Sequence, residues 1–247
     1  MIQSTKAIVL RSVKYGETSV ILTALTEQFG LQSYIIRGAR QSGKAGKSQF
    51  LQPGSLLEME VYHRDNAKLQ QVKSLQWHRI YQHLFSDILK NGMMVFVIEL
   101  LQKTITEPEE NADLFSFCES SLVWLDDTES KDVSLFPLYF CLHFSHFFGF
   151  RIPEPNPSML KKEKLFLNLQ DGLFSDQAPQ HAFYLEGKNA YAVAELLKVL
   201  HPDDLGEANV DRASRGEILD ALLLYYQFHL PSFGPLRCLP ILRAILK

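Results

Sequence analysis

Short apolar segments with a period of two fill the first eighty residues of the chain. Five of them are rich in β-branched or aromatic residues and are bounded by Gly, Asn or Pro: residues 5–13, 18–25, 31–37, 55–63 and 68–77. In the fourth segment, Leu57, Met59 and Val61 alternate with Glu58 and Glu60, which is typical of an antiparallel strand with one wet face. Strands this short and this closely spaced predict a small closed barrel.

From about residue 78 the apolar residues recur every three or four positions instead. This spacing predicts helices over residues 79–104, 112–126, 134–148, 188–200, 214–229 and 236–246. Ser214 and Glu217 have the spacing of a capping box at the start of the fifth helix. Residues 152–187 are rich in proline and contain short alternating pieces, so we expect an irregular insert there that can include a hairpin.

The net charge of -3 hides an uneven distribution of charge along the chain. Residues 1–80 contain eleven Lys or Arg and five Asp or Glu, a net of +6, so the remaining residues carry -9. A basic N-terminal part favours a polyanionic partner, such as nucleic acid or a membrane surface. A solvated surface with uneven charge and no such partner gives the same pattern.

Cysteine content and hydropathy narrow the class of protein. The three cysteines, Cys118, Cys141 and Cys238, are widely separated and form no CxxC pair, so neither a disulfide framework nor a zinc knuckle is indicated. The most continuous apolar run, residues 93–98, ends at Glu99 and is far too short to span a bilayer. With no N-terminal signal segment, we expect a cytoplasmic protein without membrane association.

A Gly- and Lys-rich stretch, residues 35–48 (IIRGARQSGKAGKS), is close to a phosphate-binding loop. Such a loop needs Gly, four residues, Gly-Lys and then Ser or Thr. Each possible register fails at one position, because Ala45 stands at the magnesium position of one and Gln41 at the first glycine of the other. The stretch leads into Pro53-Gly54 and a strand rather than into a helix, so we interpret it as a cationic loop between antiparallel strands.

Residues suited to metal binding or catalysis form no complete motif. Cys141, His143 and His146 share one helical segment, but no fourth ligand has usable spacing, and helical packing explains them better than metal binding does. The carboxylates of residues 107–132 have no partner that would assign acid and base roles. We therefore expect no enzymatic activity, no cofactor and no bound metal.

Several segments of the chain resemble the bacterial RecO family of recombination mediators. They are KAIVLRSVKYGETSVILTALTEQFGLQSYIIRGAR with LQPGSLLEMEVY, VIELLQKTITEPEENADLFSFCESSLVWLD, PLYFCLHFSHFFGFRIPEP, and ILDALLLYYQFHLPSFGPLRCLPIL. Together they cover most of the chain in the family's order. The resemblance implies an α+β protein, with a five-stranded OB-fold barrel in residues 1–78 and an all-helical C-terminal domain with an insert in residues 79–247.

The same resemblance implies a non-enzymatic function in DNA repair and recombination. Proteins of this family bind single- and double-stranded DNA and anneal complementary strands. With RecR they help to load recombinase onto DNA coated by single-stranded-DNA-binding protein, whose acidic C-terminal tail they bind. Two alternatives stay open from the residues: a nucleotidase with a P-loop-like site, and a basic adaptor for RNA or protein.

Candidate binding residues follow from these expectations. For DNA they are the cations of the loop, one further lysine and one aromatic residue: Arg37, Arg40, Lys44, Lys47, Lys14 and Tyr34. A protein tail that ends in an apolar residue and a carboxylate requires a hydrophobic pocket beside a cation. The candidates for that pocket are Phe140, Phe144, Phe148 and Arg151, to which Arg212 or Arg215 can add a cation.

The insert differs from that of many family members, which hold zinc there with four cysteines. No cysteine lies between Cys141 and Cys238 in this chain. We therefore expect a zinc-free insert that is held together by hydrophobic side chains, namely Leu165, Leu167, Phe174, Phe183 and Leu185.

Overall fold

Two units make up the chain in the computed structural model, Met1–Asp127 and Thr128–Lys247. Residues 1–39, 48–65 and 67–246 are described. The last strand of the barrel ends at Arg79, next to the domain boundary between residues 78 and 79 that the sequence predicts. The first compact unit, however, continues through two helices to Asp127.

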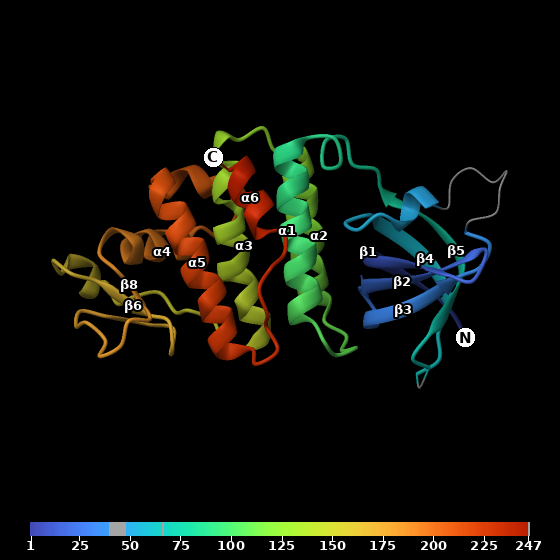
Figure 1. Ribbon diagram of the computed structural model, residues 1–247, viewed down its shortest axis with the longest axis horizontal. Coiled ribbons are helices and arrows are strands. Elements are labelled where there is room, and N and C mark those ends of the chain that lie inside the picture. Colours follow the sequence, from blue (N-terminus) through green and yellow to red (C-terminus); the bar gives the residue numbers. More distant parts are fainter. Residues whose placement is uncertain (40–47, 66, 247) are drawn as a thin grey trace. The chain divides into compact units, whose positions relative to one another are not determined.

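A closed five-stranded barrel forms the N-terminal part of the first unit and confirms the predicted barrel (Figure 1). Its strands are β1 (Ile2–Tyr15), β2 (Ser19–Thr26), β3 (Gly30–Ile36), β4 (Leu56–Tyr62) and β5 (Gln70–Arg79). They pair in the order β1-β2-β3-β5-β4, and only the short β3–β5 contact is parallel. This is the topology of a five-stranded OB-fold barrel.

The barrel core is made by alternate residues of the strands, because successive side chains in a strand point to opposite faces. On β2 these are Val20, Leu22 and Ala24, and the other strands supply residues such as Tyr34 and Met59. The intervening residues therefore lie on the outer surface of the barrel.

A β-bulge at Leu10 divides β1 into two parts. Val9 and Arg11, on either side of it, pair with consecutive residues of β2, so Leu10 is the extra residue. Strand β4 pairs with β1 only as far as Ile8. Beyond the bulge, residues 11–15 pair with β2 alone and form an arm with it.

Two helices complete the first unit, α1 (Ile88–Thr104) and α2 (Ala112–Asp127). The sequence predicted that α1 begins at residue 79, which is wrong, because the side chain of Asp87 caps the helix by accepting from the backbone N–H of Lys90. The amide Nε2 of Gln102 donates to the carbonyl of Leu10, so α1 is joined to the β1 bulge.

The turn that precedes α1 is bound by a buried carboxylate. Asp126, near the end of α2, is 0% exposed and accepts from the backbone N–H groups of Gln82, His83 and Leu84 at 3.0, 2.8 and 2.8 Å. The guanidinium of Arg79 lies 3.8 Å away. Burial raises the pKa of Asp126, but the three N–H donors and Arg79 lower it more, and the net shift is downward.

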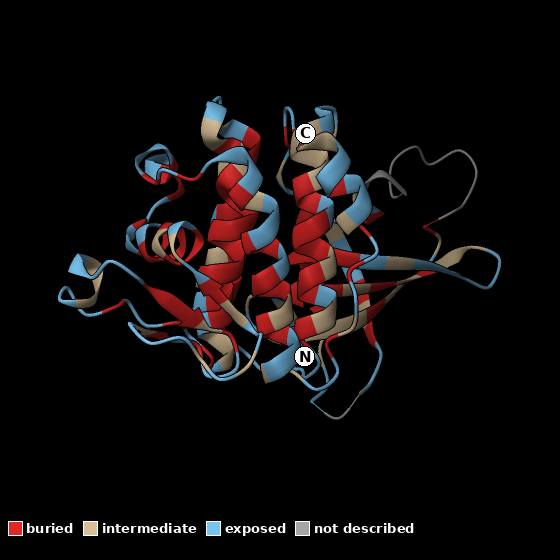
Figure 2. Cartoon of the chain, turned by 60° about the vertical axis from the view of Figure 1, so that its left-hand side comes forward, coloured by how far each residue is buried: buried red, intermediate tan, exposed pale blue. Residues whose placement is uncertain are grey.

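Helices form most of the second unit, and their buried residues face its interior (Figure 2). They are α3 (Phe136–Phe144), α4 (Lys188–Lys198), α5 (Arg212–His229) and α6 (Leu239–Ile245), with 3₁₀ turns at Lys131–Leu135, Ser145–Phe148, Met159–Lys161 and Pro202–Glu207.

The capping box expected at Ser214 and Glu217 is wrong. Asp211 caps α5 instead and accepts from the backbone N–H and the hydroxyl of Ser214. Glu217 accepts from the side-chain amide of Asn189 at 2.6 Å, which joins α5 to α4.

The insert contains three short strands, β6 (Phe166–Asn168), β7 (Leu173–Ser175) and β8 (Tyr184–Glu186), in the order β7-β6-β8. Of the residues expected to hold it together, four are buried: Leu165, Leu167, Phe174 and Leu185. Phe183 is 42% exposed, and its ring lies edge-on to Phe228 with centroids 5.2 Å apart. Within the described residues, no group of three or more His, Cys, Asp or Glu is placed to hold a metal ion.

Candidate nucleic-acid interface

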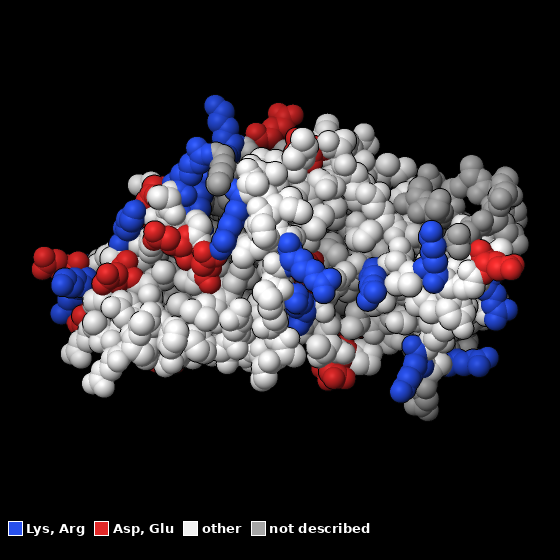
Figure 3. Space-filling view, in the orientation of Figure 1, with Lys and Arg blue, Asp and Glu red and all other residues white. Residues whose placement is uncertain are grey.

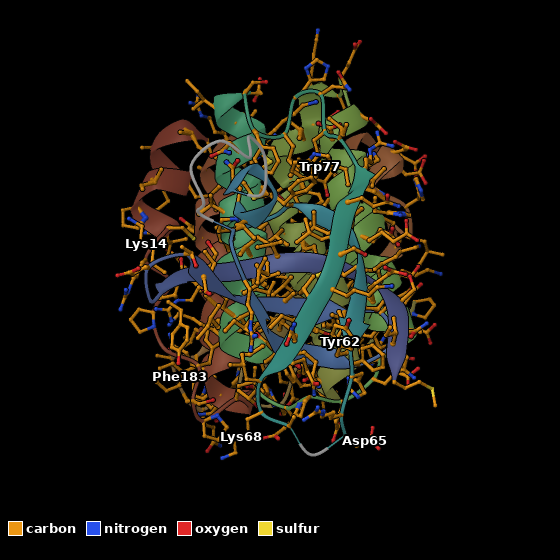
Figure 4. All side chains as sticks on the ribbon, turned by 90° about the vertical axis from the view of Figure 1, so that its right-hand side faces the viewer. Lys14, Tyr62, Asp65, Lys68, Trp77 and Phe183 are labelled. Atoms are coloured by element: carbon orange, nitrogen blue, oxygen red, sulfur yellow. The ribbon has the colours of Figure 1, made fainter. Side chains whose placement is uncertain are left out.

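The cations proposed for DNA binding separate into two groups. Lys14, in the arm, and Arg37, directly after β3, are both exposed. Figure 4 shows Lys14 at the edge of the barrel, well away from Tyr62. The other three cations, Arg40, Lys44 and Lys47, lie outside the described residues.

The expectation that Tyr34 contacts DNA is wrong. Its side chain is 0% exposed and belongs to the barrel core, where it lies opposite Leu22. Burial raises the pKa of Tyr34 to about 12. A base cannot reach a ring in this position, and period-two alternation alone did not reveal which face of β3 turns inward.

Beyond the bulge, the outer sides of the first three strands form an open surface, which we call the β1–β3 outer face. Two of its rows follow from the strand register: Arg11–Thr23–Ser33 and Val13–Ile21–Ile35. Tyr15 pairs with Ser19 at the end of the sheet where Val20 pairs with Ile36, so Arg37, the next residue, lies at that end too. Val13 is 44% and Tyr15 53% exposed.

The charge of this face is positive. Arg11 and Arg37 are exposed and form no ion pair with another described residue. The acids nearest to them in the sequence are Glu17, in the turn between β1 and β2, and Glu27, which pairs with Lys6. In Figure 3 the side of the barrel turned to the viewer carries more Lys and Arg than Asp and Glu. Together with the exposed Tyr15, such a face offers phosphate contacts and a stacking surface.

The opposite charge is found on the outer sides of β4 and β5. A hollow of about 340 Å³ there is lined by Glu58 and Glu60, among other residues. Glu60 accepts from the hydroxyl of Ser74 at 2.5 Å and pairs with Lys73 at 3.2 Å, and these two contacts, Ser74 first, lower its pKa. Glu58 accepts from Gln76 at 2.8 Å. We call this surface the acidic β4–β5 face; it disfavours a phosphate backbone.

In the second unit, the phenylalanines proposed for partner binding lie in the core. Phe140 and Phe144 are 0% exposed, with ring centroids 5.2 Å apart, so the expectation that they contact a peptide is wrong. Phe148 is half-buried and packs edge-on to Phe144. Arg151 is exposed, after the end of the helical segment.

The neighbouring histidine reflects the same apolar core. The pKa of His143 is lowered to about 4, mainly by burial and also by the charges of His146 and Arg151, while the hydrogen bond with the backbone of Val199 acts in the opposite direction. Burial also raises the pKa of the Cys141 thiol. Both groups are therefore neutral at physiological pH, as expected for side chains packed in an apolar core.

An apolar cavity of about 510 Å³ lies elsewhere in the second unit, between α3, α5 and α6. Its apolar walls include Pro137, Leu138, Leu219 and Leu246, and three arginines border it: Arg212, Arg215 and Arg243. We call it the α5 cavity. A hydrophobic hollow beside cations suits a peptide that ends in an apolar residue and a carboxylate. It is formed by residues other than Phe140, Phe144, Phe148 and Arg151, which the sequence suggested for this role.

The three arginines differ in how they are held. Arg215 donates to the hydroxyl of Ser134 and to the carbonyl of Val210, and Arg243 is paired with Asp220. The side chain of Arg212 is exposed and forms no hydrogen bond or ion pair with another described residue. The sequence suggested Arg212 and Arg215 only as additional cations for the pocket at Arg151, and it gave no indication of Arg243. The periodicity of apolar residues does not show which helices pack side by side.

A closed five-stranded barrel with this strand order, followed by a helical region, defines an OB-fold protein with a helical C-terminal part. The chain belongs to the RecO family. Residues 1–81 match the family domain described as Recombination protein O N terminal, and residues 85–237 match Recombination protein O C terminal.

Full-length relatives support this assignment. The chain is 32% identical to a DNA repair protein RecO of Christiangramia forsetii over 99% of both chains. It is 32% identical to that of Flavobacterium johnsoniae and 30% identical to that of Flavobacterium psychrophilum, in each case over 98% of both chains. Among the described residues, no helix is long and apolar enough to cross a membrane.

Proposed function

We propose that this chain is a non-enzymatic recombination mediator in DNA repair. It binds single- and double-stranded DNA, anneals complementary strands and, with RecR, helps to load recombinase onto DNA coated by single-stranded-DNA-binding protein. The observation that carries the proposal is the open β1–β3 outer face, whose Arg11 and Arg37 are free of acidic partners, in a chain that matches the RecO family along nearly its whole length.

Strand annealing tests this function directly. Two complementary oligonucleotides with a donor and an acceptor dye are mixed with the purified protein, with and without single-stranded-DNA-binding protein. We expect faster annealing than in buffer, under both conditions and without ATP, and weaker DNA binding as salt rises because phosphate contacts release counterions. An annealing rate equal to that in buffer contradicts the proposal.

The nucleotidase alternative has little support. A P-loop needs an α-helix that starts at the phosphates, whereas in this chain a four-residue 3₁₀ turn, Ser48–Leu51, leads into Pro53, Gly54 and β4. ATP hydrolysis that disappears in Lys44→Ala would favour the enzyme, and its absence in the parent protein favours the mediator.

The second part of the proposal concerns the acidic tail of single-stranded-DNA-binding protein. We assign the tail to the α5 cavity, since its terminal apolar side chain needs a hydrophobic hollow and its carboxylate needs a cation. Arg212 is the best candidate for the carboxylate because Arg215 and Arg243 already have partners. Arg212 and Arg215 also lie in the first turn of α5, where the helix dipole itself favours an anion.

Arg212→Ala and Arg151→Ala form a matched pair, because both remove an exposed arginine from the second unit. We expect Arg212→Ala to weaken binding of a labelled tail peptide by about 1.5 to 3 kcal/mol, the scale of a hydrogen bond to a charged group. Arg151 does not line the cavity, so Arg151→Ala should bind the tail peptide with the affinity of the parent protein. The reverse result in fluorescence anisotropy would return the site to Arg151.

A further inference from the structure

The outer surface of the barrel has two faces that differ in chemistry. The β1–β3 outer face combines Arg11 and Arg37 with the exposed side chains of Val13 and Tyr15. The acidic β4–β5 face carries Glu58 and Glu60, and its lysine, Lys73, is already paired with Glu60. A polyanion therefore meets attraction on one side of the barrel and carboxylates on the other.

The β1–β3 outer face ends where the first unit covers the barrel. Before the bulge, Ile8 and Leu10 of β1 and Leu25 of β2 point away from the barrel core but are 0 to 2% exposed. The amide of Gln102, in α1, donates to the carbonyl of Leu10 at this border. The open surface is thus confined to the part of the sheet that contains the arm and the end of β3.

Tyr15 and Val13 are both exposed on the outer side of the arm. Each side chain leaves about half of its surface in water, at 53% and 44% exposed, although burial of such groups is favourable. A flat aromatic ring beside a guanidinium is the combination that binds an unpaired base and its phosphate together. A duplex keeps its bases stacked and offers such a ring only phosphates and sugar.

We propose that a single strand of DNA crosses the β1–β3 outer face, where Tyr15 stacks on a base and Arg11 and Arg37 contact phosphates. This assignment rests on the proposed DNA-binding function and adds the stacking residue and the preference of this face for an unpaired strand. Val13 and Ile21, directly paired across β1 and β2, supply the apolar floor between the two arginines. The acidic β4–β5 face does not contact the strand.

Two matched pairs of variants test the assignment. Tyr15→Ala is compared with Tyr62→Ala, since Tyr62 is similarly exposed, at 40%, but lies at the end of β4, apart from Lys14 and the arm (Figure 4). Arg37→Ala is compared with Lys73→Ala, because each removes one positive charge from the barrel. Anisotropy of a fluorescein-labelled oligothymidylate and of a labelled duplex is measured across a salt series, with the full-length protein.

We expect Tyr15→Ala to weaken oligothymidylate binding by about 5- to 10-fold, which is the lower end of the range for loss of one base–aromatic stack. Duplex binding should be almost unchanged. Tyr15→Phe should restore the parent affinity because it keeps the ring. Arg37→Ala should reduce the slope of log affinity against log salt by about 0.7, one single-strand phosphate contact. Tyr62→Ala and Lys73→Ala should match the parent.

The outcomes separate this assignment from the proposed function. If the parent binds oligothymidylate but Tyr62→Ala or Lys73→Ala weakens binding as much as Tyr15→Ala or Arg37→Ala, the face is wrong and the function stands. Parent-like binding by both Tyr15→Ala and Arg37→Ala rejects the face as well. If the parent itself binds neither oligonucleotide, the proposed function fails first.

Discussion

The carboxylate of Asp126 should be one of the most important polar groups for the stability of the first unit. It is fully buried and is the acceptor for three successive backbone N–H groups, those of Gln82, His83 and Leu84. Replacing it with Ala removes all three bonds at once. The turn that leads from the barrel into α1 then loses its attachment to α2.

The size of the effect follows from the surroundings of the three donors. A hydrogen bond to a charged group contributes roughly 1.5 to 3 kcal/mol, but such bonds are not additive within one network. Gln82 and His83 are exposed, so water can replace the carboxylate there, whereas Leu84 is buried and its N–H is left without a partner. We therefore expect Asp126→Ala to lower the free energy of unfolding by about 3 to 5 kcal/mol.

Urea unfolding followed by tryptophan fluorescence measures this change. Both tryptophans, Trp77 and Trp124, belong to the first unit, so their emission reports on it alone. Asp127→Ala is the matched control, because Asp127 is the next residue, is 54% exposed and, among the residues that the structure describes, forms an ion pair only with Arg79. An exposed ion pair of this kind contributes about 1 kcal/mol or less.

The pH dependence supplies a second check. The pKa of Asp126 is lower in the folded state, so its contribution is fully present above the unfolded value of about 4 and is lost as pH falls through the folded pKa. The difference between the parent and Asp126→Asn should therefore shrink below about pH 4. Equal urea midpoints for the parent and Asp126→Ala at pH 7, or an equal loss in Asp127→Ala, would refute the reasoning.

Three further predictions concern the second unit and the thiols. Leu167 is fully buried in the insert, so Leu167→Ala should lower the free energy of unfolding by about 2 to 5 kcal/mol, measured by thermal unfolding. A metal chelator should leave the stability of the parent protein unchanged. One equivalent of zinc in the purified protein would contradict a zinc-free insert. The pKa of His143 is about 4 in the folded protein and about 6.5 in the unfolded chain, so the second unit should lose stability as pH falls from 6.5 toward 4. His143→Phe should make this decline less steep. Part of the decline should remain, because the pKa values of His146 and His229 are also lowered. The three cysteines are buried, so an aromatic disulfide reagent at pH 8 should label them only after unfolding, and rapid labelling of the native protein would show that the core is open.

Alternation and turn residues were sufficient to locate the strands. The predicted segments 18–25, 31–37 and 55–63 differ by one residue at most from the ends of β2, β3 and β4. This works because one wet face imposes a period of two over the whole strand. The start of α1 could not be found in this way, since residues 79–87 are apolar enough to continue the helical pattern, and Asp126, about forty residues away, holds them in a turn.

The candidate sites were less accessible to sequence reasoning. Period-two alternation divides β3 into two sets of residues but does not say which set enters the barrel, so Tyr34 was assigned to DNA although it lies in the core. The apolar helix at Phe140 and Phe144 likewise suggested a pocket where the side chains already fill the space. The α5 cavity depends on Arg243 and Leu246 meeting α5, which is a tertiary contact with no local signal.

The bulge at Leu10 acts as a phase shift in the pattern of β1. Before it, odd-numbered residues such as Ala7 and Val9 enter the barrel; after it, odd-numbered Arg11, Val13 and Tyr15 point outward. Deleting Leu10 would turn the side chains of either the arm or the rest of the strand to the opposite face, because a shift of one residue reverses the orientation of every position that follows. The length of β1, and not only its composition, therefore encodes which side chains the barrel presents to the outside.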